Sequence, residues 1–162
     1  MAIQELNGLM VQGLRAVYDG EQQGTQAAAA ISEKATNPEL KQLLQQGSEQ
    51  AKDHLRRVEQ AITKAGGQVR GEPNAIVKGI VETGNKIMNT TEDPDARDAG
   101  IIASGQIAAH YYIAAYGTLR SYADTLGNQD VSRLAQSVLD EFKQRDQAMT
   151  QLATRVVNPQ AA

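Results

Sequence analysis

The chain has 162 residues, a formal net charge of −3 at pH 7, a hydrophobic share of 41% and a charged share of 22%. These values are typical of a soluble globular protein, and they predict a single domain over residues 1–162 with a sizeable core and no electrostatic attraction for nucleic acid. Cysteine is absent, which excludes disulfides, thiolate metal sites and cysteine nucleophiles.

Proline and glycine divide the chain into five predicted helices, because proline favours the first turn of a helix and glycine the position just past its end. No stretch shows the sustained alternation of a strand. The predicted helices cover, in chain order, residues 3–36, 38–65, 73–88, 95–126 and 129–157.

The first two predicted helices each carry an apolar stripe. Residues such as Met10, Val17 and Ile31 in the first helix are separated by sums of three and four residues, which places them on one face. The helices are joined tightly at Asn37-Pro38. We therefore expect them to form an antiparallel hairpin.

The last two long helices, over 95–126 and 129–157, show the same stripes and the same tight connection. A long connection holding the helix over 73–88 separates the two hairpins, which disfavours an up-down bundle with three short loops. The sequence thus predicts an all-α fold: a ferritin-like four-helix bundle with a long crossover that contains a short fifth helix. No stretch resembles a membrane span or a signal peptide, so we expect a cytoplasmic protein without membrane partners.

Ferritin-like bundles hold two iron or manganese ions between carboxylates and histidines at mid-helix, because two close cations need several anionic oxygens at one height. The candidate ligands here are Glu21, His54, His110 and Glu141. Each has a structural alternative that we favour. Glu21 fits a carboxylate at the edge of the stripe, and His54 fits a hydrogen-bonded core histidine. His110 fits a contact between helices, and Glu141 fits a solvated pair with its neighbour Asp140.

Glu49 is a weaker candidate, because five residues separate it from His54. Five residues rotate a helix by about 500°, so the two side chains differ in direction by about 140°. They cannot chelate one ion together, and Glu49 is expected to face solvent.

A family resemblance follows from several segments, of which residues 98–127 (DAGIIASGQIAAHYYIAAYGTLRSYADTLG) are the most specific. Supporting matches are YDGE at 18–21, NPEL at 37–40, RVE at 57–59, GIVETG at 79–84 and LDE at 139–141. Together these segments closely resemble the YciE/YciF family of ferritin-like bacterial proteins. The resemblance covers nearly the whole chain.

Departures from the family pattern concern the ligands that the resemblance implies. The family has roughly Glu-His-Tyr-Glu where this chain reads AHYY at 109–112. It has a histidine where Gly47 stands, and acids near Gln50 and Phe142. Among the inward-facing ligands, only Glu21 clearly remains. We infer that an apolar and aromatic core has replaced the metal site, with Tyr112 and Phe142 filling space left by the small residues Gly47 and Ala109.

The preferred hypothesis is therefore a non-catalytic structural or interaction protein without a cofactor. The resemblance adds an association with bacterial stress responses. It also implies a homodimer, formed through the exposed side of the helix over 95–126 or the N-terminal half of the first helix.

Two alternatives stay open. One is a di-iron or di-manganese oxidase or peroxidase with atypical ligands, drawn from Glu21, His54, His110 and Glu141. The other is a small-ligand pocket inside the bundle, lined by Tyr112, Tyr116 and Phe142.

Overall fold

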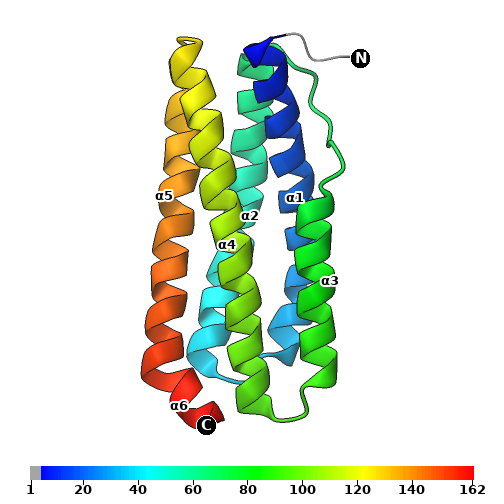
Figure 1. The fold of residues 1–162 in the computed structure, drawn as a ribbon, viewed down its shortest axis with the longest axis vertical. Coiled ribbons are helices and arrows are strands. Elements are labelled where there is room, and N and C mark those ends of the chain that lie inside the picture. The colour runs from blue at the N-terminus through cyan, green and yellow to red at the C-terminus, as the bar shows by residue number, and fades with distance from the viewer. Residues whose placement is uncertain (1–4) are drawn as a thin grey trace.

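The computed structural model describes residues 5–162, which form long helices joined mostly by short connections (Figure 1). The helices are, in chain order, α1 (Leu6–Lys34), α2 (Pro38–Lys64), α3 (Ala75–Thr90), α4 (Pro94–Thr125) and α5 (Gln129–Leu152). A π-helical turn (Ala153–Val157) and a short helix α6 (Asn158–Ala161) follow α5. Residues 5–162 contain no strand, so the predicted all-α class is confirmed.

The predicted boundaries agree with the helices to within a few residues, except at the end of the last helix. The expected start at residue 3 lies outside the described residues. The crossover helix begins at Ala75 and not at Pro73, because the side chain of Asn74 caps it by accepting a hydrogen bond from Val77 N at 3.0 Å. The last predicted helix is interrupted at the π-helical turn. Pro159 follows this turn and has no N–H with which to continue an α-helical ladder.

Two connections use the same start signal. Asn37 and Asp93 are the capping residues, and each precedes a proline at the first helical position. The side chain of Asn37 accepts from the backbone N–H of Glu39 at 2.9 Å, and that of Asp93 accepts from Ala96 N at 2.8 Å. These caps fix the points at which α2 and α4 begin.

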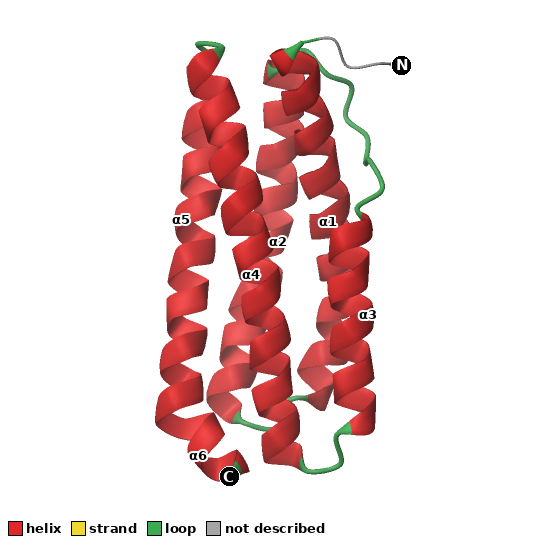
Figure 2. Ribbon diagram, viewed as in Figure 1, coloured by secondary structure: helices red, strands yellow, loops and turns green. Residues whose placement is uncertain are grey.

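The helices pack as two antiparallel hairpins, α1 with α2 and α4 with α5 (Figures 1 and 2). The crossover between the hairpins carries α3, which packs along the seam between α1 and α4. One long crossover between two hairpins is the connectivity of ferritin-like bundles. Among residues 5–162, no helix combines the length and the apolarity that crossing a membrane requires.

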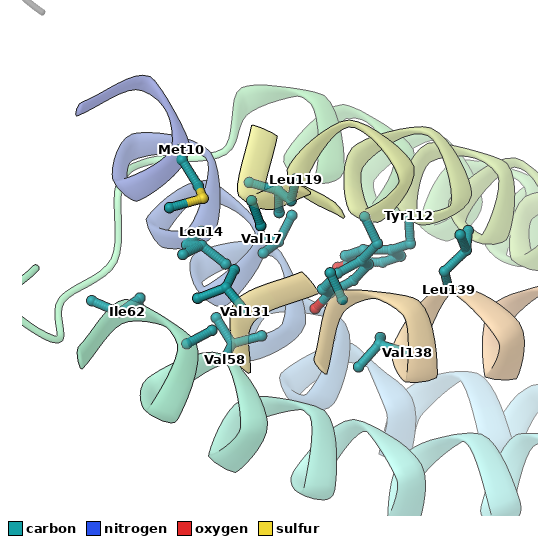
Figure 3. Packing of buried hydrophobic residues seen from close by; sticks show 14 of the residues in the cluster. Met10, Leu14, Val17, Val58, Ile62, Tyr112, Leu119, Val131, Val138 and Leu139 are labelled. Atoms are coloured by element: carbon teal, nitrogen blue, oxygen red, sulfur yellow. The ribbon is translucent and has the colours of Figure 1, made fainter. Parts of the chain in front are cut away.

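The buried side chains form two apolar clusters along the bundle. The larger one is shown in part in Figure 3 and includes Met10, Leu14, Val17, Val58, Ile62, Tyr112, Leu119, Val131 and Val138. The smaller one includes Leu40, Met88, Ile101, Ile102, Met149 and Leu152. Most of these residues belong to the stripes that the sequence predicts. Polar side chains lie at mid-helix, near the large aromatic residues of the first cluster.

One buried carboxylate ties the two hairpins together near the C-terminal end of α1. Asp98 of α4 is fully buried. Its carboxylate accepts hydrogen bonds from Thr36 N at 2.9 Å, Thr36 Oγ1 at 2.7 Å and Asn37 N at 2.7 Å. Asp98 thus satisfies backbone donors in the turn between α1 and α2, a role that the sequence analysis did not predict.

Candidate site at the centre of the bundle

Three of the predicted candidates form a continuous polar row across the bundle. His54 of α2 has no exposed surface, and its Nδ1 lies 3.1 Å from Glu21 Oε1 of α1. Its Nε2 lies 2.9 Å from Glu141 Oε2 of α5. Each ring nitrogen of His54 therefore faces one carboxylate oxygen, and the ring bridges Glu21 and Glu141.

Burial corrects one prediction within this row. Glu21 does not sit at the edge of the apolar stripe, because its side chain is only 4% exposed. The preference for a hydrogen-bonded core histidine at His54 is confirmed. Glu141 is half-buried, whereas its neighbour Asp140 is exposed, so the two do not form a solvated pair.

The row reaches the surface through arginine. Glu141 Oε1 accepts from Arg57 Nη1 at 2.6 Å, and Arg57 also pairs with Asp53 one turn earlier on α2. Burial alone would raise the pKa of Glu141, but the hydrogen bonds from His54 and Arg57 outweigh burial and lower it. Glu141 is therefore ionised at neutral pH. Glu21, at one end of the polar row, is buried, whereas Arg57, at the other end, is partly exposed to solvent.

Three aromatic rings pack beside the row. The rings of Tyr112 and Phe142 stack with their centroids 4.5 Å apart, and Tyr116 lies 6.1 Å from Phe142. The hydroxyl of Tyr116 lies 3.5 Å from Glu21 Oε1. Burial raises the pKa of Tyr112 and Tyr116 well above the usual value, and the charge of Glu21 raises both further. Both phenols therefore keep their protons.

A cation that the sequence analysis did not consider completes the centre. Arg145 of α5 lies over the ring of Phe142 at 4.9 Å, and its Nη2 donates to Gln50 Oε1 at 2.8 Å. A Cβ built on Gly47 would lie 3.3 Å from the guanidinium carbon. Gly47 thus admits Arg145, which corrects the expectation that Tyr112 or Phe142 fills this space.

A spacing signal for Arg145 was present in the sequence. It continues the apolar stripe of α5 between Phe142 and Met149, at the spacing of three and four that marks the inner face of the helix. A charged residue at such a position either reaches out to solvent or pairs inside the bundle. Arg145 pairs inside the bundle.

The donor set does not fit a dinuclear metal centre. Residues 5–162 contain no group of three or more Asp, Glu, His or Cys side chains arranged to hold a metal ion. Both nitrogens of His54 already face carboxylates, and these two carboxylates lie at opposite edges of the ring. Glu21 and Glu141 therefore do not converge on one position. The adjacent guanidinium of Arg145 would also repel a second cation.

The remaining candidates lie away from the centre. His110 is 66% exposed, and its Nε2 lies 3.1 Å from Asp146 of α5. The predicted contact between helices is therefore confirmed, and His110 does not join Glu21 and His54. Glu49 is exposed, as predicted.

The comparisons with known proteins define the family. The family described as "Domain of unknown function (DUF892)" matches residues 5–162. This chain belongs to that family. It is 29% identical to Protein YciF of Escherichia coli strain K12 over 162 residues, which cover 99% of this chain and 98% of YciF. The resemblance inferred from the sequence is thereby confirmed.

Solved structures agree with the fold. The crystal structure of the E. coli stress protein YciF matches with a TM-score of 0.91 and 29% identity, over 96% of this chain and 99% of that one. YcfI of Rhodopseudomonas palustris, whose proposed role is structural, matches with a TM-score of 0.89 and 32% identity, over 91% and 94%. A protein of Xanthomonas campestris pv. campestris shares the fold at 18% identity, with a TM-score of 0.75 over 94% of each chain.

Proposed function

We propose that this protein is a non-catalytic, ferritin-like member of its family that lacks a functional dinuclear metal centre. It would act in the bacterial cytoplasm as a structural or interaction protein associated with stress. One observation carries the proposal: both nitrogens of His54 face the carboxylates of Glu21 and Glu141, so these carboxylates do not converge on one position for a metal ion. Two relatives support the role, since YciF is named a stress protein and the proposed role of YcfI is structural.

Charge balance supports the loss of the metal centre. Carboxylates buried in a bundle need positive charge nearby, which metal ions supply in a dinuclear protein. Here His54 and Arg57 contact the carboxylates directly, and the guanidinium of Arg145 lies close enough to Glu21 and Glu141 to interact electrostatically. Side-chain cations thus take over the role that metal ions would have.

Metal analysis tests this proposal. The chain is purified without chelator, incubated with Fe²⁺ and then with Mn²⁺ and desalted, and its metal content is measured by mass spectrometry. We expect far less than one ion per chain. A content of about two ions per chain, as in a dinuclear protein, would overturn the proposal and favour the oxidase or peroxidase alternative.

Two variants refine the test. In Glu21→Gln we expect the metal content to stay at the background level of the wild type while stability falls. Glu49→Gln, at an exposed position, serves as the control that should change neither quantity. A metal content that drops only in Glu21→Gln would identify a true ligand at Glu21.

A homodimer is part of the proposal. The groove between α1 and α4 includes Leu9, Ala115 and Tyr122, and it joins the two faces that the sequence suggests for dimer formation. Leu9 is 40% exposed although it is apolar. Analytical ultracentrifugation should give twice the chain mass for the wild type and the mass of one chain for Leu9→Lys. The exposed substitution Gln26→Lys is the control.

A further inference from the structure

A narrow apolar slot lies beneath α3, in the seam between α1 and α4. Its volume is about 130 Å³. It exists because small residues stand where the three helices face one another: Gly24, Ala27, Gly84, Gly105 and Ala108. Leu44 of α2 also lines it. The slot is distinct from the predicted pocket, because Tyr116 and Phe142 do not line it and only Tyr112 is shared.

The lining of the slot is almost entirely apolar. Along α3 it extends from Val77 to Met88, a distance of roughly 16 Å at the rise of an α-helix. Ser104 and Tyr112 are the two polar side chains in this lining, and Ser104 Oγ already donates to Gly100 O at 3.0 Å. An apolar cavity of about 150 Å³ stays dry and takes up benzene. The slot therefore suits a slender apolar molecule better than it suits water.

The hydroxyl of Tyr112 gives this slot a polar end. Tyr112 is 5% exposed, and its hydroxyl has no hydrogen-bond partner. A Cβ built on Gly20 would lie 2.9 Å from that hydroxyl and 3.0 Å from Val77 Cγ2, so the hydroxyl is beside the Val77 end of the slot. A buried phenol without a partner is costly, and it is ready to donate to an acceptor.

The charge near Tyr112 selects the kind of acceptor. Burial raises the pKa of Tyr112, and the negative charge of Glu21 raises it further, so the phenol remains a donor. Glu21 affects this hydroxyl more strongly than the opposite charge of Arg145 does, so a second anion nearby is disfavoured. An uncharged carbonyl oxygen therefore fits better than a carboxylate.

We propose that the slot beneath α3 binds a small unbranched aliphatic molecule with one uncharged hydrogen-bond acceptor, such as an alkyl ketone. The chain of the ligand lies along α3 between Val77 and Met88, and its carbonyl oxygen accepts from the Tyr112 hydroxyl. Ala27 and Ala108 contact the chain from either side of the seam.

Nuclear magnetic resonance of the full chain, with labelled methionine methyl groups, tests the proposal. Methyl pentyl ketone is the probe, and heptane and heptanoate are its matched controls. We expect a saturable shift of the Met88 signal with the ketone and no shift of Met10, which lies in the other core cluster. Heptane should bind more weakly, and heptanoate more weakly still.

Three substitutions locate the ligand. Ala27→Leu should fill the slot and abolish the shift, whereas Ala29→Leu, at an exposed position of the same helix, should leave ketone affinity unchanged. Ala108→Leu fills the slot from α4 and repeats the test if Ala27→Leu does not fold. Tyr112→Phe should weaken ketone binding about three- to tenfold, by the loss of one hydrogen bond, and leave heptane binding unchanged.

Several outcomes would overturn the proposal. Met88 could fail to respond to any probe, or a folded Ala27→Leu or Ala108→Leu could bind the ketone as the wild type does. Tighter binding of heptanoate than of the ketone would refute the uncharged acceptor. None of these measurements concerns metal content, so such a failure would leave the proposed function standing.

Discussion

Two buried carboxylates, Asp98 and Glu21, are stabilised in opposite ways. Asp98 lies at the end of the bundle and accepts hydrogen bonds mainly from backbone N–H groups of the turn between α1 and α2. Glu21 lies at the centre, and its hydrogen-bond partners are side chains only. They are His54 of α2 and, at 3.5 Å, Tyr116 of α4. Asp98 is thus held by backbone groups whose positions the fold fixes, whereas Glu21 depends on particular side chains.

This difference indicates which part of the scaffold can change its chemistry. Backbone donors stay in place when side chains are exchanged, so Asp98 is tied to the fold itself. The partners of Glu21 can be replaced one at a time, and the charges at the centre can be rebalanced by residues such as Arg145. The centre is thus the part of the bundle whose charges can change while the helices stay in place.

The largest effect is expected at Asp98. Asp98→Ala removes a buried acceptor and leaves the partly buried backbone donors at residues 36 and 37 without their partner, which should lower the free energy of unfolding by about 2–4 kcal/mol. Urea denaturation measures it, and Glu92→Ala, an exposed position close to the start of α4, is the control. A loss below about 1 kcal/mol would contradict the role assigned to this carboxylate.

Glu21→Gln should have a smaller effect. The amide still reaches His54 Nδ1, but the charged carboxylate that pairs with the ring is lost. We expect a loss of about 1–3 kcal/mol in the free energy of unfolding. Urea denaturation measures the loss, and a free energy of unfolding equal to that of the wild type would contradict the role of Glu21 as the partner of His54.

The fall in the free energy of unfolding at acidic pH should depend in part on Glu141. Its pKa is lowered in the folded state, so its contribution is present above the ordinary glutamate pKa of about 4.3 and is lost as pH falls through the lower folded value. Urea denaturation between neutral and acidic pH should therefore show a shallower decline for Glu141→Gln, by about 1 kcal/mol. Glu33→Gln, at an exposed position, should follow the wild type.

The smallest effect is expected at His110. Its contact with Asp146 is at the surface, and exposed ion pairs contribute little. His110→Gln should change the free energy of unfolding by less than about 0.5 kcal/mol and leave the metal content unchanged. If metal were bound by the wild type and lost in this variant, the interpretation of His110 as a surface residue would be wrong.

The sequence predicted the bundle because its signals are local. Asn37-Pro38 and Asp93-Pro94 mark helix starts within four residues, and the stripes repeat within each helix. The missed features depend on residues far apart in the chain. Asp98 accepts hydrogen bonds from a turn about 60 residues earlier in the chain, and no spacing rule within α4 points to that turn.

The site was predicted in part for the same reason. His54 was correctly placed inside the bundle because it falls on an apolar stripe. Glu21 was placed at the stripe's edge, since the sequence could not show that His54 and Tyr116 of other helices shield it from water. Arg145 was overlooked because a long charged side chain usually reaches solvent, and its inward course depends on the room above Gly47.

The side chains that contact the central carboxylates, His54 and Arg57, are covalent parts of the chain. If the bundle is metal-free, as proposed, its charge balance is complete as soon as the polypeptide leaves the ribosome, and its maturation would require neither insertion machinery nor a scarce nutrient. A cell starved of iron would then make this bundle as readily as a cell that has plenty.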